Sequence, residues 1–418
     1  MWCKKFNILA RIIPCNAWWI IKFKFYILLF SFTALSAYGF QLDDLLNGPL
    51  SELQQDKINT GFFQCSYPNE LISYDRKHKI LGYPVREVIL RFTSEKCFKA
   101  ADIIVAYSVG TKMASRVQDI GNELAIKIVN HLKQLPKESV YIFPNGAKVN
   151  IKRWSQNSCR IYLFCRFNND ASKNKKFSLV FLRIEPTTIP EKSFVQMLRL
   201  KSVPLYQKTT PDGGKLLNVP MRSQLPDSKG CWFTSVARQL NYLGSEINSL
   251  TVDFIGVWAN SKKNNLGKLL NFKRQIIQIN NRSTVEKGCL QFIKNYNEAA
   301  QIAKQPTIPL LAKGNRWNDN MKRAKPDILA KTNLEFINPK QYRFFCSIIK
   351  KNIDKNIPVG WFVVRCIRGA HYRLIIGYNS TKDTLYYSDS WSPKTEIKEM
   401  PTICVYLMTR HLEIYTTL

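Results

Sequence analysis

The sequence predicts an α+β fold in two units, each of which combines helices with strands. Before residue 200, runs of β-branched and aromatic residues alternate with one long segment of helical periodicity. A stretch rich in Pro, Gly and Thr then interrupts these patterns, and beyond it a helix and mostly helical sequence lead to closely spaced strands. The 418 residues, 45% of them apolar, suffice for about two or three domains with a large core. We divide the chain into residues 1–39, a signal peptide or membrane anchor; residues 40–204, an α+β accessory domain; and residues 205–418, the domain with the candidate site.

The first 39 residues predict an export signal. Basic residues precede the apolar run "FYILLFSFTALSAYG", which has the length of a signal-peptide core and is short for a membrane span. Small residues at Ala37 and Gly39 predict cleavage after Gly39. An uncleaved anchor is the alternative, because counting back to Trp18 gives a longer apolar stretch broken only by Lys22 and Lys24. In both cases the rest of the chain is expected outside the cytoplasm: periplasmic, secreted or membrane-anchored.

The accessory domain is expected to carry no catalytic residues. Its two histidines, His78 and His131, stand without a partner motif, and Asn145-Gly146 marks a tight turn. We therefore predict an accessory, propeptide-like or targeting role for this part of the chain. Strands are expected at residues 86–92, 102–109, 139–144, 159–167 and 177–186, and a helix at residues 111–135.

The C-terminal domain begins near residue 205, where "PDGG" predicts a turn. A short strand, a loop and a helix follow, and then a mixed, mostly helical region. The last strands follow each other so closely that we expect an antiparallel hairpin or meander packed near the first helix. The expected elements are a strand at 218–223, a loop at 224–231, mainly helices at 245–357 with one helix from 339 that ends before Pro358, strands at 359–367, 371–378 and 384–391, and a polar turn at 379–383.

The net charge of the chain is strongly positive, with 62 basic against 30 acidic residues, or +32. Such a protein is expected to adhere to anionic lipid, cell-wall polymer or nucleic acid, or to act on acidic substrates. A general bias of the sequence toward Lys, Asn and Ile explains the charge equally well. Zinc-finger spacing, a Gly-aromatic RNA-binding signature and a basic helix with heptads are all missing from the sequence, so we expect no specific nucleic-acid binding.

The cysteine count is odd once the signal is removed. Of 11 cysteines, Cys3 and Cys15 leave with the signal, and 11 − 2 = 9 remain. An exported protein with an odd count has at least one thiol without an internal partner. Several cysteines stand in apolar runs such as "RIYLFCRF" and "WFVVRCI", where buried thiols are expected at least as often as disulfides. We expect Cys231 to be the unpaired thiol.

Cys231 is predicted to begin an amphipathic helix. Unpaired backbone N–H groups and the positive end of the helix dipole favour the thiolate there, and the thiolate is the form that attacks a carbonyl. Gly244 stands where a C-terminal cap is expected. A core position is the ordinary alternative for a cysteine in a helix. The apolar face is formed by Phe233, Val236, Ala237, Leu240 and Leu243.

Three further residues complete a candidate site with Cys231. His371 starts an apolar strand directly after a Gly-Ala pair, and Asp389 lies at the end of the next strand, where it could orient the imidazole. Gln224 precedes the cysteine by seven residues and could supply an amide donor to an oxyanion, together with the backbone N–H of Cys231. Each residue alone has an ordinary structural explanation. Their joint occurrence favours a cysteine nucleophile with a histidine base.

Two sequence blocks resemble papain-like cysteine peptidases. "GCWFTS", preceded by Gln224, is similar to their active-site segment, in which a glutamine precedes a Gly-x-Cys-Trp-x-Phe-Ser helix start. "AHYRLIIGY" followed by "DSW" is similar to their histidine strand with its downstream Asn-Ser-Trp. "VPMRSQ", "NYLG" and "HYRLIIGY" also resemble the bacterial peptidases that process double-glycine leaders, the bacteriocin-processing type, and their stand-alone relatives, which use Asp as the third residue. The resemblance covers roughly residues 215–415.

The resemblance implies a two-lobed fold, a helical lobe and an antiparallel β lobe with a cleft between them. It implies that Cys231 is the nucleophile, His371 the general base and acid, and Asp389 the orienting residue. Gln224 would then be the oxyanion donor, and Trp391 would shield the histidine from water. A protein or peptide substrate is expected, and neither a cofactor nor a metal.

Departures from both patterns leave the subfamily and the exact chemistry open. Phe233 stands one place earlier than in the papain pattern, and the leader peptidases usually continue Cys-Gly-Pro where this chain has Cys-Trp-Phe. Transglutaminases and wall-peptide amidases also use Cys, His and Asp, so acyl transfer of that type is one alternative. A catalytically inactive, basic binding protein is another. Substrate specificity and oligomeric state are left open by the sequence.

Overall fold

A computed structural model gives the architecture of most of the chain beyond residue 39. It describes residues 40–58, 63–67, 69–109, 114–142, 148–156, 158–167, 177–193, 196–197, 207–220, 222, 231–244, 272–309, 320–365, 369–390 and 397–417. The predicted export signal, the Asn145-Gly146 turn, Gln224 and Trp391 lie outside these ranges. None of the helices within them has the length and apolar character needed to cross a membrane.

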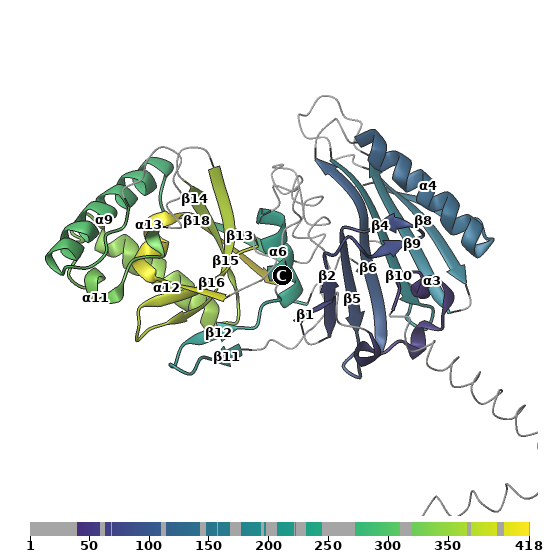
Figure 1. Cartoon of the computed structure of the whole chain (residues 1–418), viewed down its shortest axis with the longest axis horizontal. Coiled ribbons are helices and arrows are strands. Elements are labelled where there is room, and N and C mark those ends of the chain that lie inside the picture. The colour runs from purple at the N-terminus through teal and green to yellow at the C-terminus, as the bar shows by residue number, and fades with distance from the viewer. Residues whose placement is uncertain are drawn as a thin grey trace, which may run out of the picture.

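Two antiparallel sheets face one central helix, α6 (Cys231–Tyr242). In Figure 1, α4 covers the outer side of the N-terminal sheet, and helices α9, α11, α12 and α13 cover the outer side of the C-terminal sheet. Helix α6 lies between the two sheets (Figure 1). Each sheet has its own apolar core under its outer helices, and a third core cluster joins both sheets to α6.

The N-terminal sheet has eight strands in the order β1-β2-β5-β6-β10-β9-β8-β7. All five predicted strands and the predicted helix are confirmed, whereas β1, β2 and β8 were missed. Strands β1 and β2 have only four residues each, and β8 is largely polar. The strands are β1 Gln64–Tyr67, β2 Glu70–Ser73, β5 Glu87–Phe92, β6 Phe98–Val109, β7 Lys137–Ile142, β8 Lys148–Gln156, β9 Cys159–Phe167 and β10 Phe177–Pro186, and α4 is Ala114–Leu132. Short elements at its margin are α3 Asp44–Asn47, η1 Leu50–Glu52, η2 Gln55–Lys57, β3 Lys79–Ile80 and β4 Tyr83–Pro84.

The C-terminal sheet has the path β11-β12-β15-β14-β18-β13, with β16 and β17 added beside β15. The predicted antiparallel meander of three strands is confirmed, and its middle strand packs on α6. Gly377 of β15 lets the paired strand β12 approach closely, because a Cβ at this position would lie 2.2 Å from the carbonyl oxygen of Lys215. The strands are β11 Gln207–Thr209, β12 Lys215–Leu217, β13 Phe272–Gln278, β14 Val359–Arg365, β15 Gly369–Asn379, β16 Thr384–Ser388, β17 Ile397–Pro401 and β18 Thr409–Thr417.

Two long helices of this domain begin at capping residues that the sequence provides. Asn281 caps α9 by accepting from the backbone N–H of Thr284, and Asn338 does the same for the first turn of α12, which starts with Pro339. The predicted helix that ends before Pro358 is confirmed. The region thus combines helices with an antiparallel sheet, while its division into two lobes by a cleft stays a prediction. The helices are α9 Arg282–Ile302, α11 Pro326–Leu329, α12 Pro339–Asp354 and α13 Thr402–Met408.

The strand predicted at residues 218–223 is wrong. The strand here is β12, which ends at Leu217, and it pairs with β11 through the "PDGG" turn. The backbone N–H of Thr210 donates to the carbonyl of Gly214 at 2.8 Å and closes this turn. Pro220 has no N–H to contribute to a ladder, so the chain leaves the sheet before it. Strand β13 was also missed, within the region expected to be mainly helical, and so were β17 and β18.

Candidate active site

Cys231 is the first residue of α6, as the sequence predicts. Its side chain is half-buried and carries a thiol rather than a disulfide. The start of a helix is where a thiolate is stabilised by backbone N–H groups and by the helix dipole. The position of this sulfur therefore suits a nucleophile.

The predicted apolar face of α6 is confirmed, but the partner of this face is the N-terminal sheet. Phe233 and Val236 belong to the core cluster that includes Tyr162, Phe164 and Phe181 of strands β9 and β10. From Phe233 to Tyr242 every residue of the helix is buried. The accessory unit thus packs directly on the helix that begins with Cys231.

The polar residues of α6 are fixed by hydrogen bonds to the C-terminal domain. Ser235 donates to the carbonyl of Tyr372 at 3.4 Å, and this carbonyl follows His371 directly in the chain. Arg238 donates from Nε to the carbonyl of Pro220 at 2.8 Å, and Gln239 donates to the carbonyl of Pro358 at 3.0 Å. Burial lowers the pKa of Arg238 to about 10. These bonds hold the helix against β15 and against the chain at Pro220 and Pro358.

Trp232 anchors the helix start from the other side. Its indole N–H donates to Oε2 of Glu413 on β18 at 2.8 Å. The guanidinium of Arg274 lies 5.4 Å from the Trp232 ring and is ion-paired with the same Glu413. A tryptophan next to the cysteine therefore has a structural role here, which the sequence motif alone did not assign.

His371 and Asp389 are in direct contact, both of them buried. Nε2 of His371 lies 2.7 Å from Oδ1 of Asp389. His371 lies near the start of β15, opposite Val363 of β14, and Asp389 follows the end of β16. An ionised carboxylate only accepts hydrogen bonds, so Nε2 carries the proton and Nδ1 is the nitrogen that can accept one. The contact fits an orienting carboxylate, while the catalytic roles of both residues stay a prediction.

Arg373 is a second partner of Asp389 that the sequence reasoning missed. Its Nε donates to Oδ2 of Asp389 at 2.8 Å, so both oxygens of the carboxylate are engaged by side chains of β15. The guanidinium lies 5.3 Å from the ring of Trp361 and 5.1 Å from the ring of Tyr387. The signal was present, because His371 and Arg373 are two residues apart in one strand and so face the same side. The arginine fixes the carboxylate that holds the histidine.

The segment before Cys231 is tied to the accessory unit. Arg222, two residues before Gln224, is only 1% exposed, and its Nη2 lies 2.8 Å from Oε2 of Glu70 on β2. Gln224 itself and Trp391 fall outside the described residues, so their predicted roles stay predictions. Arg222, which precedes Gln224 and Cys231 in the chain, is thus held by an ion pair with the N-terminal sheet.

Four of the other cysteines are buried thiols of a different kind, whereas Cys97 and Cys346 are half-buried like Cys231. Cys159, Cys165, Cys289 and Cys404 are buried, and burial raises the pKa of each of them. A raised pKa disfavours the thiolate, so these side chains act as small apolar core residues. This contrast sets Cys231 apart by its place at a helix start.

A comparison with family models identifies the C-terminal part of the chain. The model of the Peptidase_C39 like family matches residues 216–414, from β12 to β18, a range that contains Cys231, His371 and Asp389. Searches of the curated proteins and of the solved structures found no match to this chain. Residues 216–414 are therefore a domain of the Peptidase_C39 like family, papain-like cysteine peptidases related to the peptidases that process bacteriocins.

Proposed function

We propose that this protein is a cysteine peptidase that cleaves peptide bonds through an acyl-enzyme on Cys231. The observation that carries the proposal is the 2.7 Å hydrogen bond between His371 and Asp389 in a domain of a peptidase family. The hydrogen bond from Ser235 to Tyr372 ties the helix of Cys231 to the strand of His371. Nucleophile, base and orienting carboxylate thus come from three elements packed on one another.

The first half of the reaction forms the acyl-enzyme. Nδ1 of His371 takes the proton of the Cys231 thiol, and the sulfur attacks the carbonyl carbon of the scissile bond. The tetrahedral intermediate collapses as its C–N bond breaks, and the imidazolium gives its proton to the leaving amine. Asp389 holds the Nε2 proton throughout and stabilises the imidazolium. Arg373 keeps Asp389 in place.

The second half releases the acid product. Water attacks the thioester carbonyl while Nδ1 of His371 takes one of its protons, and the proton returns to the sulfur as the C–S bond breaks. The oxyanion of both tetrahedral intermediates needs two donors. We assign them to the backbone N–H of Cys231 and the side-chain amide of Gln224, in line with the motif resemblance. Trp391 is proposed to exclude water from the histidine.

We further propose that the peptidase acts outside the cytoplasm. The proposal rests on the basic and apolar pattern of residues 1–39. Expression of the full chain followed by N-terminal sequencing of the exported protein tests it. A mature N-terminus at Phe40 is expected, whereas an intact N-terminus on soluble intracellular protein would contradict export.

The experiment that tests the peptidase activity compares the wild-type chain with Cys231→Ala on a mixture of peptides. Mass spectrometry of the products is expected to show cleavage by the wild type and none by the variant. The matched control is Cys346→Ala, which removes another half-buried thiol from helix α12. Full hydrolysis by Cys231→Ala would overturn the proposal. Activity needs the thiolate and the imidazolium together, so the rate is expected to be bell-shaped in pH.

The same experiment separates hydrolysis from acyl transfer and from mere binding. Added primary amine gives an amine adduct in place of the acid if the site works as a transglutaminase does. A thiol-directed epoxide is expected to label Cys231 in the wild type and to block cleavage. An epoxide that labels Cys346 but leaves Cys231 unmodified would favour a binding protein without catalysis.

A further inference from the structure

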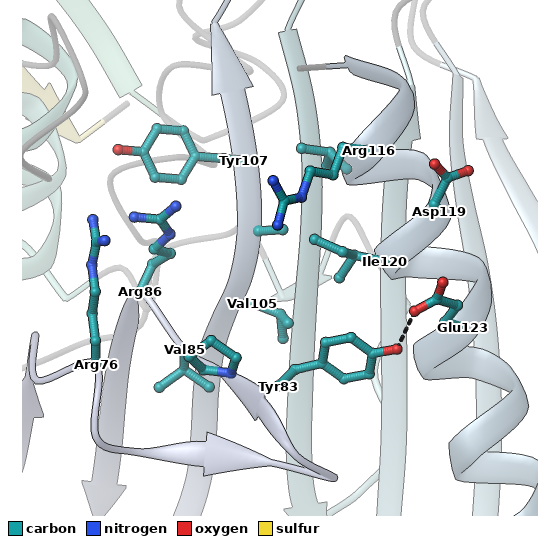
Figure 2. A pocket seen from close by; sticks show the side chains of 13 residues that line it. Arg76, Tyr83, Val85, Arg86, Val105, Tyr107, Arg116, Asp119, Ile120 and Glu123 are labelled. Carbon is teal, nitrogen blue, oxygen red and sulfur yellow. Dashed lines mark hydrogen bonds between the residues drawn. The ribbon is translucent and has the colours of Figure 1, made fainter.

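Glu123 and Glu413 both accept hydrogen bonds outside the proposed catalytic residues, but their surroundings are opposite. Glu123 belongs to α4, in the wall of a pocket of about 530 Å³ in the accessory unit, where it accepts from the hydroxyl of Tyr83 (Figure 2). Its side chain is exposed. Glu413 belongs to β18 in the peptidase domain and is 0% exposed. A carboxylate that is removed from water needs partners within the protein, so Glu413 is the one held in a fixed place.

Among the described residues, three side chains donate to the Glu413 carboxylate. Its Oε2 accepts from the indole N–H of Trp232 at 2.8 Å. Its Oε1 accepts from Nε of Arg274 and from the hydroxyl of Tyr415, the latter at 3.0 Å. Because all three partners donate, both oxygens have to be acceptors. A glutamine at this position would turn its NH2 group toward a donor and lose the bond on that side.

Trp232 connects this carboxylate to the first turn of α6, where it directly follows Cys231. The guanidinium of Arg274 lies 5.4 Å from the centre of the Trp232 ring, so the indole is held both at its N–H and at its face. Gln239, seven residues further along the same side of the helix, donates to the backbone carbonyl of Glu413 at 3.5 Å. Two contacts on one side of α6 limit its rotation about its own axis.

Tyr372 brings the strand of His371 next to Glu413. Its side chain is fully buried, and its hydroxyl fills the space beside Gly360, where a Cβ would lie 1.7 Å from it. Gly360 is the partner of Glu413 in the pairing of β14 with β18. Burial, together with the negative charge of Glu413, raises the pKa of Tyr372 well above 10. The residue after His371 and the residue after Cys231 therefore both lie beside Glu413.

We propose that Glu413 is a positioning residue for Cys231 and His371. It acts through Trp232, whose fixed indole holds the first turn of α6 and thereby orients the Cys231 sulfur toward the imidazole. The roles of Cys231 and His371 rest on the proposed function, whereas the contacts of Glu413 do not. Glu413 touches none of the reacting atoms, so its loss is expected to slow the same chemical steps rather than to change them. A displacement of about 1 Å at a reacting group can lower a rate about 100-fold.

Steady-state kinetics on the full chain compare the wild type with Glu413→Gln, using a peptide that the wild type cleaves. We expect kcat to fall about 10- to 100-fold while KM stays within about twofold, because the contacts with the substrate are unchanged. Trp232→Phe removes the indole N–H but keeps an aromatic ring, and it is expected to lower kcat by a similar factor. The double variant should be no slower than Glu413→Gln alone, since both changes break one bond. Additive losses would overturn the path through Trp232.

Two control variants separate positioning from a general loss of stability. Tyr415→Phe removes another hydrogen bond from the same carboxylate and leaves the bond to Trp232 in place. Glu123→Gln makes the same substitution at the exposed carboxylate of the accessory pocket (Figure 2). Both are expected to keep kcat within about twofold of the wild type at a temperature where every variant is folded. A Tyr415→Phe protein as slow as Glu413→Gln would show that the carboxylate is only structural.

The indole N–H signal of Trp232 reports the bond directly. In protein labelled with ¹⁵N-tryptophan, Trp232→Phe identifies this signal among those of the nine tryptophans by its absence. Glu413→Gln is expected to shift the signal, because a charge-assisted hydrogen bond is lost, and Tyr415→Phe to leave it near its place. An unshifted signal in Glu413→Gln would refute the proposal. Should Glu413→Gln not fold, Trp232→Phe carries the test, and an unchanged kcat in that variant would refute it.

Failure of the proposed function gives a different result. If the wild type cleaves no peptide, the rate at which a thiol-directed epoxide labels Cys231 replaces kcat, with mass spectrometry of the labelled peptides. Glu413→Gln is then expected to slow the labelling of Cys231 about tenfold, while Cys346 is labelled at the same rate in both proteins. Slower labelling without cleavage would keep the positioning role and remove the peptidase. Equal labelling of Cys231 in both proteins would overturn the positioning role.

Discussion

Among the described residues, the N-terminal sheet and the C-terminal domain each hold a buried network of charged side chains, and the two networks differ in what they can do. In the N-terminal sheet, six charged residues of alternating sign run across five strands. In the C-terminal domain, Asp389 lies between His371 and Arg373. The first network consists of carboxylate and guanidinium side chains that pair with one another across the sheet, whereas the second contains an imidazole, the side-chain type that most often serves as a general acid or base. The six residues are Glu70, Arg91, Asp102, Arg183, Glu185 and Arg160.

Register explains the first network. Glu70 lies opposite Arg91, Asp102 opposite Arg183, and Glu185 opposite Arg160 in neighbouring strands. Cross-strand neighbours of opposite charge stabilise an antiparallel sheet, and equal numbers of both signs avoid a buried net charge. The contact between His371 and Asp389 is different, because Asp389 lies beyond the last paired residue of β16. The difference teaches that burial alone does not make a charged group a candidate for catalysis. The group must also be able to exchange a proton with a candidate nucleophile.

The largest expected effect distinguishes the networks by activity. His371→Ala removes the proposed base, so kcat/KM for a cleaved peptide is expected to fall by about 10³-fold or more. The midpoint of thermal unfolding is expected to change little in comparison. Steady-state kinetics and calorimetry on the same preparation measure both. If His371→Ala unfolded the protein without lowering the activity of the remaining folded fraction, the histidine would be structural, like the residues of the first network.

The second effect concerns the contribution of the first network to the stability of the protein. Arg183→Met leaves Asp102 and Glu185 with one fewer buried cation, and breaking such a network is expected to cost about 3–5 kcal/mol in the free energy of unfolding. Denaturation by urea measures this loss. The double variant Arg183→Met with Asp102→Leu is expected to recover part of it, because no unmatched charge is left. Lower kcat in a fully folded Arg183→Met protein would contradict a purely structural role.

The sequence predicted the helices and strands better than it predicted the packing between them. The bounds of β9 and β10 agree with the apolar runs at residues 159–167 and 177–186, because buried central strands have strong local patterns. Strand β13 lacks such a pattern, since most of its residues are not buried. The face of α6 was predicted from periodicity. Its partner, the N-terminal sheet, was not, because packing between distant segments leaves no local signal.

For the candidate site, too, the sequence predicted local contacts but not contacts between distant segments. The two sequence blocks around Cys231 and His371 predicted the contact of His371 with Asp389, since neighbouring strands bring their side chains together. The link from Arg222 to Glu70 could not be predicted, because 152 residues separate the partners. A local motif reveals the chemistry of a site, whereas the groups that hold it in place come from anywhere in the fold.

The third effect is a pH dependence of stability that comes from Glu87. This side chain is buried beside the first network. Burial raises its pKa from 4.5 to about 7, although the charges of Arg222 and Arg91 act to lower it. The folded state thus retains a proton that the unfolded state has lost between pH 4.5 and 7. Stability from Glu87 is therefore complete below pH 4.5 and falls as pH rises to 7, by up to about 3 kcal/mol.

Glu87→Gln tests this dependence, because an amide resembles the protonated carboxyl. The variant is expected to flatten the decline in the free energy of unfolding between pH 4.5 and 7, measured by urea titration at several pH values. Glu298→Gln, on the exposed surface of α9, is the control and should leave the curve unchanged. A wild-type stability that rises over this range, with the same rise in Glu87→Gln, would contradict the assignment.

The smallest expected effect tests whether the first network reaches the candidate site. Glu70 contacts Arg91 of the first network through one oxygen, at 3.0 Å, and Arg222 through the other, at 2.8 Å. Because Arg222 precedes the segment that leads to Gln224 and Cys231, Glu70→Gln is expected to lower kcat by about tenfold with little change in KM, as for other residues that position a catalytic group. Glu70→Asp keeps the charge and should restore part of the loss, while the pH profile of kcat should keep its shape. If Glu70→Gln changed only the stability, the first network would be independent of the site, and the accessory unit would support the peptidase domain without tuning its site.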